Sequence, residues 1–448
     1  MNLPNYFLAD LPPEATLSPL MITEACQTLK RNRAQYLAQR STNSLVHLLC
    51  DVAGAWLKPD NTFRKLALEL GQEKTGFSRA TLQNGLDQFF RRFTPENFRE
   101  LLAQELGEAD SSRHSPAVTR HSWCGPELLV HIAAGSIPNP TLMSITLGLL
   151  TRSAQFVKCA SGSAFLPRLF AHSIYEADAK LGACLEIAEW RGGQAELESA
   201  LFADADCVTA TGSDETLTAI RVRLPVKTRF IGYGHRVSFG FVAHEILSGS
   251  YAQRIIARAA DDVVAWNQLG CLSPHVIYVQ TGGEVSPEKF AERLADELER
   301  REQTEPRGEL PGEHAATIAS RRGIYEVRAA HAPETTQHWC SKNSTAWTVV
   351  YETDARFQLS CLNRFIYVKP VRDLAEALQQ AEVVRGQVST VGLGVPEHKL
   401  EELAGQLAQW GVTRVCPLGR MQNPPLTWRH DGRPALGDLV TWTDLEQS

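Results

Sequence analysis

One cysteine of this chain has an unusual local setting, at a tight turn that leads directly into a β-strand. The turn spans Asn267–Pro274 and carries Cys271 between a glycine and a leucine, and the apolar run His275–Val279 follows it. A thiol on such a turn would be held by rigid elements and directed at a cleft. A buried cysteine is usually only a small packed side chain, so the turn alone makes Cys271 a candidate nucleophile, and the support for that role comes from the turns that precede it.

Three turns upstream of Cys271 have the composition of a phosphate or ribose site. Each follows a predicted strand, and they cover Ala134–Pro140, Val157–Ser163 and Thr211–Asp214. Glycine lets a ligand approach the backbone closely, and the N-terminus of a following helix attracts phosphate. Lys158, at the end of its strand, suits ribose or phosphate oxygens. The common G-x-G-x-x-G fingerprint does not follow the first strand, so only the three turns together indicate a dinucleotide site.

The elements that must position these residues alternate between strand and helix. This alternation predicts an α/β fold with parallel sheets, whose ligands bind at the carboxyl ends of the strands. Before it, residues 1–118 are predicted to form a helical region, in which Thr94 caps a helix that reaches Leu106. The first predicted strands are Leu128–Ala133, Gln155–Cys159, Cys207–Thr211 and Arg229–Tyr233.

The organisation of the chain follows from these elements. The charged segment 302–313 is predicted to be an exposed loop, and Asp261 and Asp262 are predicted to lie on a solvated helix face. The expected domains are an N-terminal helical region (1–118), a nucleotide-binding domain (119–245), a catalytic domain (246–420) and a C-terminal tail that packs back on the body (421–448).

Composition excludes several classes of protein. The 448 residues carry a net charge of −6, which gives no reason to expect nucleic acid as a partner. No apolar run is long enough to span a bilayer, and the first residues do not resemble a signal peptide. Ten scattered cysteines form no CxxC pair, so we predict no metal site and a reducing, cytoplasmic location.

Taken together, these residues resemble the LuxC-type acyl-CoA reductases, a family within the aldehyde dehydrogenase superfamily. The resemblance covers roughly Leu128 to the C-terminus. It rests on the segments His131–Pro138, Val157–Lys158, Thr211–Ser213, Gly232–Ser238, Gly270–Pro274, Arg414–Gly419 and His430–Gly432. It implies two Rossmann-like lobes with parallel sheets, next to the N-terminal helical region.

The resemblance also implies roles for individual residues. Cys271 matches the nucleophile, which would form an acyl-enzyme that hydride from a nicotinamide releases as an aldehyde. Lys158 matches the lysine that contacts the adenosine ribose. Gly212 and Ser213 match the turn that receives the pyrophosphate, and Gly234 is expected beside the cofactor.

Three positions depart from the wider superfamily. The glutamate that activates water in aldehyde-oxidising relatives is missing from Gly232–His235, which favours an acylating reductase. Ser136 stands where many relatives have the oxyanion asparagine, so Ser136, Asn139 or the backbone N–H of Cys271 could stabilise the oxyanion. Ser161 replaces a glutamate that binds the 2′-hydroxyl of NAD, which favours NADPH with Lys158 pairing the 2′-phosphate.

We therefore expect an NADPH-dependent reductase that converts a long-chain acyl-CoA or acyl-protein thioester to an aldehyde, which in the family can feed luciferase. The expected partner is an acyl-protein synthetase, and the superfamily implies a homo-oligomer. One alternative is an acylating aldehyde dehydrogenase for a short-chain or phosphorylated substrate. Another is a non-catalytic subunit that carries an acyl group or binds a partner.

Overall fold

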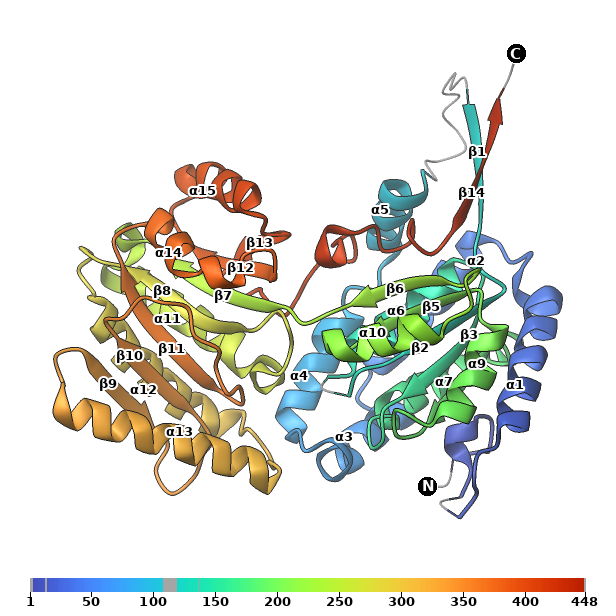
Figure 1. The fold of residues 1–448 in the computed structure, drawn as a ribbon, viewed down its shortest axis with the longest axis horizontal. Helices are drawn as coiled ribbons and strands as arrows, with labels where there is room; N and C mark the ends of the chain where they lie inside the picture. The colour runs from blue at the N-terminus through green and yellow to red at the C-terminus, as the bar shows by residue number, and fades with distance from the viewer. Residues whose placement is uncertain (1–2, 13, 108–118, 136, 447–448) are drawn as a thin grey trace.

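The computed structural model describes residues 3–12, 14–107, 119–135 and 137–446. Two α/β lobes lie side by side, one built on a five-stranded sheet and the other on a seven-stranded sheet (Figure 1). Helices from the start of the chain pack against the five-stranded lobe. The expected α/β fold, with two lobes of largely parallel strands and an N-terminal helical region, is confirmed.

The N-terminal helices begin where a polar side chain can cap their free N–H groups. Each cap accepts a hydrogen bond from the backbone N–H three residues further on. The caps are Ser18, Ser41, Asn61, Ser78 and Thr94. The helices are α1 (Pro19–Asn32), α2 (Thr42–Trp56), α3 (Thr62–Thr75), α4 (Arg79–Phe90) and α5 (Pro95–Leu106). The helix predicted from Thr94 to Leu106 is therefore confirmed.

The five-stranded sheet is parallel throughout and has the strand order β4-β3-β2-β5-β6. Its strands are β2 (Leu128–Ile132), β3 (Ala154–Cys159), β4 (Leu185–Glu189), β5 (Cys207–Thr211) and β6 (Arg229–Tyr233). Its helices are α6 (Asn139–Leu150), α7 (Phe165–Ala177), α8 (Ala179–Gly182), α9 (Ala195–Asp204) and α10 (Asp214–Arg223). Trp56 of α2 ties the N-terminal helices to α7, because its indole N–H donates to Ser173 Oγ at 2.9 Å.

The seven-stranded sheet has the order β13-β12-β7-β8-β11-β10-β9, and only its edge strand β9 runs antiparallel to its neighbour. Its strands are β7 (Val237–Val242), β8 (Pro274–Gln280), β9 (Thr336–Cys340), β10 (Thr348–Glu352), β11 (Phe365–Val371), β12 (Val388–Gly394) and β13 (Arg414–Pro417). Its helices are α11 (Gly249–Val264), α12 (Pro287–Thr304), α13 (Gly312–His331), α14 (Leu374–Gln380) and α15 (Glu397–Trp410).

The chain passes from one lobe to the other between β6 and β7. Because β7 pairs with both β8 and β12, the crossing lies between residues 233 and 237, about ten residues before the domain boundary expected at residue 245. The segment after β13 returns toward the five-stranded lobe, where Arg229 Nη1 donates to the Val440 carbonyl at 2.7 Å. It ends in β14 (Thr441–Glu446), which pairs antiparallel with β1 (Thr119–Cys124) in a ribbon that projects from the body (Figure 1).

Two predictions of exposed charge are wrong at individual residues. Asp262 of α11 is only 1% exposed, and its carboxylate accepts the N–H groups of Gly419 and Met421. Residues 305–311 form a loop within the predicted segment, but α12 continues to Thr304, α13 begins at Gly312 and Arg307 is buried. Both side chains are buried by segments distant in the sequence, which a local pattern does not reveal.

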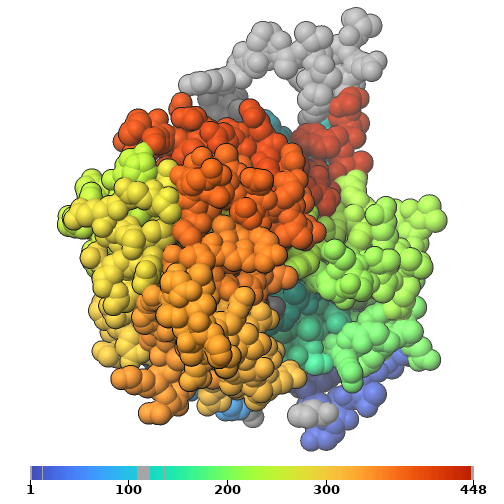
Figure 2. Space-filling model, turned by 60° about the vertical axis from the view of Figure 1, so that its left-hand side comes forward, coloured from blue at the N-terminus to red at the C-terminus, as the bar shows by residue number. Residues whose placement is uncertain are grey.

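The described residues contain no helix that is both long and apolar enough to cross a membrane. Nor do they bring three or more His, Cys, Asp or Glu side chains together in a way that could hold a metal ion. In the space-filling view, the orange and red C-terminal part of the chain lies toward the top, and its red end lies beside the green residues of the five-stranded lobe (Figure 2).

Candidate active site

Cys271 lies in the turn that leads into β8, at the amino end of the seven-stranded sheet. A short helical turn, Ala265–Gln268, precedes it, and the Ser238 hydroxyl donates to the Cys271 carbonyl at 2.8 Å. The same hydroxyl accepts the N–H of Thr390 on β12 at 3.2 Å, so the backbone of Cys271 is fixed to the sheet. The residue remains exposed to solvent.

Cys271 is a weak acid in this setting. It is accessible to solvent but surrounded by protein, and the resulting desolvation raises the pKa of Cys271 to about 11. The negative charge of Asp431 raises it further, while Arg236 and Arg414 act in the opposite direction. The thiol is therefore protonated at neutral pH, and its attack on a substrate requires removal of the proton.

A largely apolar cavity of about 150 Å³ extends from Cys271 between the lobes. Its walls come from α4, from α6, from the turn of Cys271 and from the returning C-terminal segment. The apolar lining includes Phe89, Ile137, Met143, Leu147, Leu272, Pro424, Leu426 and Trp428. Such a cavity suits a hydrocarbon chain with one reactive end at the thiol.

Asn139 is brought to the same cavity as Cys271. It is the first residue of α6, and its Oδ1 atom is buried without a hydrogen-bond partner among the described residues. Because the oxygen and nitrogen of a carboxamide exchange places when the group flips, Asn139 can present either a donor or an acceptor to a substrate. The other side chain considered for the oxyanion, Ser136, lies outside the described residues.

An aromatic group at the cavity was missed by the sequence analysis as a site. Tyr233, at the end of β6, stacks on His430 with ring centroids 4.3 Å apart, and Trp428 lies 4.7 Å from the same imidazole. All three residues line the cavity. Burial lowers the pKa of His430, so its imidazole is neutral at pH 7. In the sequence, the segment His430–Gly432 gives no signal of a site beyond its part in the family resemblance.

Asp431 is the charged neighbour of that group. Its side chain is 5% exposed and pairs with Arg236 at 3.0 Å. Arg236 follows β6 and Asp431 belongs to the C-terminal segment, so the pair joins two distant parts of the chain beside Cys271.

The three predicted turns lie at the carboxyl ends of β2, β3 and β5. The first two line a cavity of about 100 Å³, and Gly135, Gly162 and Ser163 are among the residues in its wall. At the third, Ser213 caps α10 by accepting the N–H of Thr216. Gly234 is packed closely on this helix, because an added Cβ would lie 2.4 Å from Asp214 Oδ1. The small residues of these turns leave room for a dinucleotide close to the backbone.

Lys158 and Ser161 lie on the second of these turns. Lys158 is buried at the end of β3, with its ammonium 5.7 Å from the centre of the Trp190 ring, and burial lowers its pKa. Beside Ser161, the carboxylate of Glu189 accepts the N–H groups of Gly162 and Ala164 at 2.7 and 3.1 Å. Glu189 cannot be predicted at this turn from the sequence, because only the pairing of β3 with β4 brings it there.

Comparison with known proteins gives one family and one fold. The family model "Acyl-CoA reductase (LuxC)" matches residues 37–442. A long-chain acyl-protein thioester reductase of Photobacterium leiognathi is 22% identical over 321 residues, which are 71% of this chain but only 64% of the relative. Its counterpart from Aliivibrio fischeri is 23% identical over 326 residues, with the same two coverages. The chain thus matches less than two thirds of the length of these relatives.

Solved structures extend the likeness to the whole chain. A NAD-dependent benzaldehyde dehydrogenase from Corynebacterium glutamicum has a TM-score of 0.69 at 14% identity, covering 96% of this chain and 91% of its own. Proline utilization A from Bradyrhizobium japonicum has a TM-score of 0.70 at 15% identity, covering 96% of this chain and 45% of its own. The fold is that of the aldehyde dehydrogenases.

Proposed function

The chain belongs to the acyl-CoA reductase (LuxC) family, and on that premise we propose that it reduces a long-chain acyl thioester to an aldehyde with NADPH. One observation carries the proposal: an accessible thiol, that of Cys271, and an unpartnered carboxamide, that of Asn139, line the same apolar cavity. The acyl chain would occupy the cavity with its carbonyl carbon at Cys271.

In the proposed reaction, the Cys271 thiolate attacks the carbonyl carbon of the thioester. A new C–S bond forms, and the original thiol leaves with a proton. Asn139 is expected to donate from its side-chain N–H to the carbonyl oxygen as negative charge builds there. NADPH, when bound, supplies the hydride that reduces the acyl group. The bond to Cys271 then breaks, its electron pair returns to Sγ, and the aldehyde leaves.

The charges around the cavity support reduction rather than hydrolysis of the acyl-cysteine. None of the described residues that line the cavity is an aspartate or a glutamate. Asp431, which acts electrostatically on Cys271, pairs with Arg236 through Oδ2, and its Oδ1 is buried without a hydrogen-bond partner among the described residues. Without a carboxylate in the lining of the cavity to activate water, the acyl group is expected to survive until hydride reaches it.

The cofactor is proposed to lie along the three turns of the five-stranded lobe. Gly212, Ser213 and Gly234 would receive the pyrophosphate, and Lys158 the ribose and its 2′-phosphate. Ser161 adds no charge that would repel this phosphate, and the nearby Glu189 carboxylate is occupied by two backbone N–H groups. The expected outcome is a kcat/KM for NADPH at least tenfold above that for NADH. Lys158→Ala should reduce this preference for NADPH.

The source of the acyl group is also a proposal. The names of the bacterial relatives point to an acylated protein, and the family name points to acyl-CoA. A partner acyl-protein synthetase, a homo-oligomeric state and a cytoplasmic location stay predictions. Light scattering of the purified protein, alone and with a synthetase, checks the first two.

The test is acylation of the thiol followed by reduction. Incubation with acyl-CoAs of increasing length, without cofactor, should add one acyl mass to Cys271, and NADPH should then release the aldehyde. Cys271→Ser should abolish both steps. Cys124→Ser is the matched control, because Cys124 is also an exposed thiol but lies away from the cavity.

Two other results would replace the proposal. Acylation only by short or phosphorylated acyl groups would favour a different acylating dehydrogenase. A wild-type protein that forms no adduct at Cys271 with any acyl-CoA or acyl-protein would point to a non-catalytic subunit.

A further inference from the structure

We propose that Arg364, a buried arginine outside the cavity, is a positioning residue for Cys271 and acts through Asn267. The inference rests on the proposed function, because it assigns Arg364 a part in thiol attack. Arg364 stands directly before β11 and is 1% exposed. It does not line the cavity that contains Cys271.

The turn before Cys271 has an unfavourable backbone. Trp266, Asn267 and Gln268 have φ angles of 49°, 53° and 63°, in the left-handed region that residues with a Cβ rarely adopt. Asparagine tolerates this region better than tryptophan or glutamine. Three such residues in succession persist only where surrounding contacts hold them. The position of Cys271 therefore depends on the contacts that stabilise this turn.

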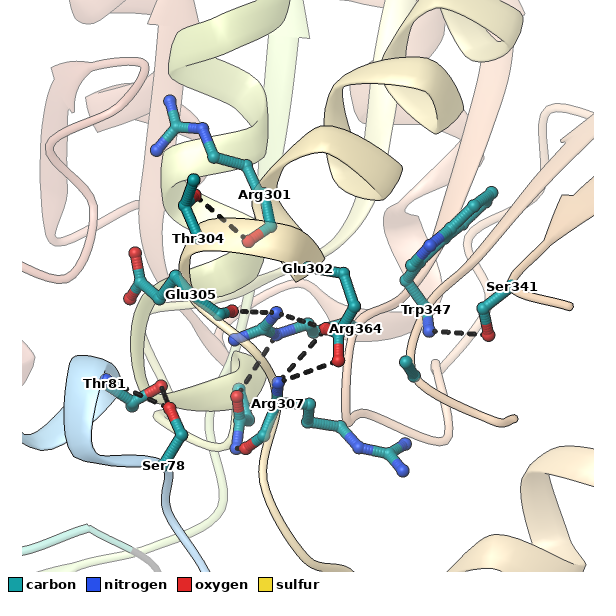
Figure 3. A network of polar contacts seen from close by, with 12 residues as sticks. Ser78, Thr81, Arg301, Glu302, Thr304, Glu305, Arg307, Ser341, Trp347 and Arg364 are labelled. Carbon is teal, nitrogen blue, oxygen red and sulfur yellow. Dashed lines mark hydrogen bonds and ion pairs between the residues drawn. The ribbon is translucent and has the colours of Figure 1, made fainter. Parts of the chain in front are cut away.

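A second left-handed turn faces the first. Leu362, Asn363 and Arg364 have φ angles of 62°, 57° and 66°. Side chains join the two turns twice. Arg364 Nε donates to Asn267 Oδ1 at 3.1 Å, and Gln268 Nε2 donates to the carbonyl of Phe365 at 2.9 Å (Figure 3 shows Arg364).

The segment after α12 completes the arrangement. Arg364 Nη1 donates to Glu302 Oε2 at 3.0 Å and to the Glu305 carbonyl at 2.8 Å. On its other side, Asn267 Nδ2 donates to the Arg307 carbonyl at 2.8 Å, and Arg307 N–H donates back to the Glu302 carboxylate. The Arg364 guanidinium thus connects the turn of Asn267 to the end of α12 and the segment that follows it, in one network of hydrogen bonds (Figure 3).

The chemistry of this network requires arginine. Its planar guanidinium reaches a carboxamide, a carboxylate and a carbonyl at once, whereas a lysine ammonium is a single point on a flexible stem. Burial lowers the pKa of Arg364 to about 10, so the group is still protonated at neutral pH. Loss of the guanidinium would leave the Asn267 oxygen and the Glu305 carbonyl without their donor, and the turn could relax.

A double-mutant cycle tests the proposal. Arg364→Met and Asn267→Gly should each lower kcat about 100-fold, because a misplacement of about 1 Å has effects of that size. The KM for the acyl substrate should change less than about threefold. Glycine accepts the left-handed backbone, so Asn267→Gly removes the contact without adding strain. Both changes break the hydrogen bond between Arg364 and Asn267, so the double variant should lose far less than the product of the single effects, about 100-fold rather than about 10,000-fold.

The matched control is Arg322→Met. Arg322 is a partly buried arginine of the same seven-stranded lobe, and it donates to Thr348, Ser341 and Trp347 rather than to the turn. The Arg322→Met variant should keep kcat within about threefold of the wild-type value even if its melting temperature falls. If Arg364→Met does not fold, Arg364→Lys and Asn267→Gly still test the contact.

Alkylation of Cys271 by iodoacetamide separates this proposal from the proposed function, because it needs no acyl substrate or cofactor. Arg364→Met and Asn267→Gly should change the alkylation rate of Cys271 about tenfold relative to Arg322→Met. Three results would overturn the role of Arg364. They are equal alkylation rates in the wild type and the three variants, a kcat of Arg364→Met within about threefold of the wild type, or a loss of kcat in the double variant that equals the product of the two single losses. A wild-type enzyme without reductase activity but with the expected alkylation pattern would overturn only the proposed function.

Discussion

The acidity of Cys271 is controlled in part by a single buried carboxylate, that of Asp431. Replacement of Asp431 by asparagine removes this negative charge and leaves Arg236 without its partner. Both effects lower the pKa of Cys271, because Asp431 raises it and Arg236 lowers it. Asp431 has a φ of 54°, which asparagine also tolerates, so the backbone of the C-terminal segment should be preserved.

The size of the effect follows from the thiolate fraction. With a pKa of about 11, only about 0.1% of Cys271 is ionised at pH 8. Burial is the largest cause of the raised pKa of Cys271, and Asp431 is the next. We therefore expect this pKa to fall by about one unit in Asp431→Asn. A decrease of one unit raises the thiolate fraction about tenfold but lowers its nucleophilicity about threefold. Alkylation at pH 8 should therefore be about three times faster.

The assay is the rate of iodoacetamide modification of Cys271 between pH 7 and pH 10, followed by peptide mass spectrometry. In the wild type, the rate should rise about tenfold per pH unit without a plateau, because the pKa lies above this range. Asp354→Asn is the control. Asp354 is also paired with an arginine, Arg356, and it lies in the seven-stranded lobe that carries Cys271. An unchanged or slower rate in Asp431→Asn, or a wild-type plateau below pH 9, would refute the electrostatic reasoning.

Three further predictions concern the oxyanion, pH-dependent stability and the core. Asn139→Ala should lower kcat at least 100-fold, about 3 kcal/mol, with little change in KM, as steady-state kinetics would show. Burial raises the pKa of Glu186 to about 8 from its ordinary value near 4.5, so the folded protein keeps a proton that the unfolded chain loses as pH rises. Glu186→Gln should therefore raise the melting temperature at pH 8 but not at pH 4; Gln can still accept the N–H of Leu8. Trp56→Ala, which removes a stack on Phe90 with centroids 5.0 Å apart, should lower the free energy of unfolding by about 3–5 kcal/mol in urea titrations.

Much of the architecture could be predicted because the signals were local. The strand–turn–helix units around Lys158 and Ser213 follow from short apolar runs and glycine- or serine-rich turns, and Thr94 and Pro95 mark the start of α5. These features depend on neighbouring residues, which a single sequence displays directly.

The rest depends on contacts between distant segments. Asp262 was predicted to face solvent, but the chain near residue 420 buries it and supplies two N–H donors. Trp428 and His430 reach the cavity only because the C-terminal segment folds back over the junction of the lobes. Glu189 reaches the second turn through strand pairing. No periodicity reports such placements, since they are fixed by tertiary packing.

The returning C-terminal segment has a consequence for how the protein is made. Trp428 and His430 form part of the wall around Cys271, and β14 joins β1 across more than 300 residues of chain. On the ribosome, the thiol emerges about 150 residues before these aromatic side chains. A nascent chain would therefore display its nucleophile in an unfinished groove, and the acyl-binding wall would close only late in translation.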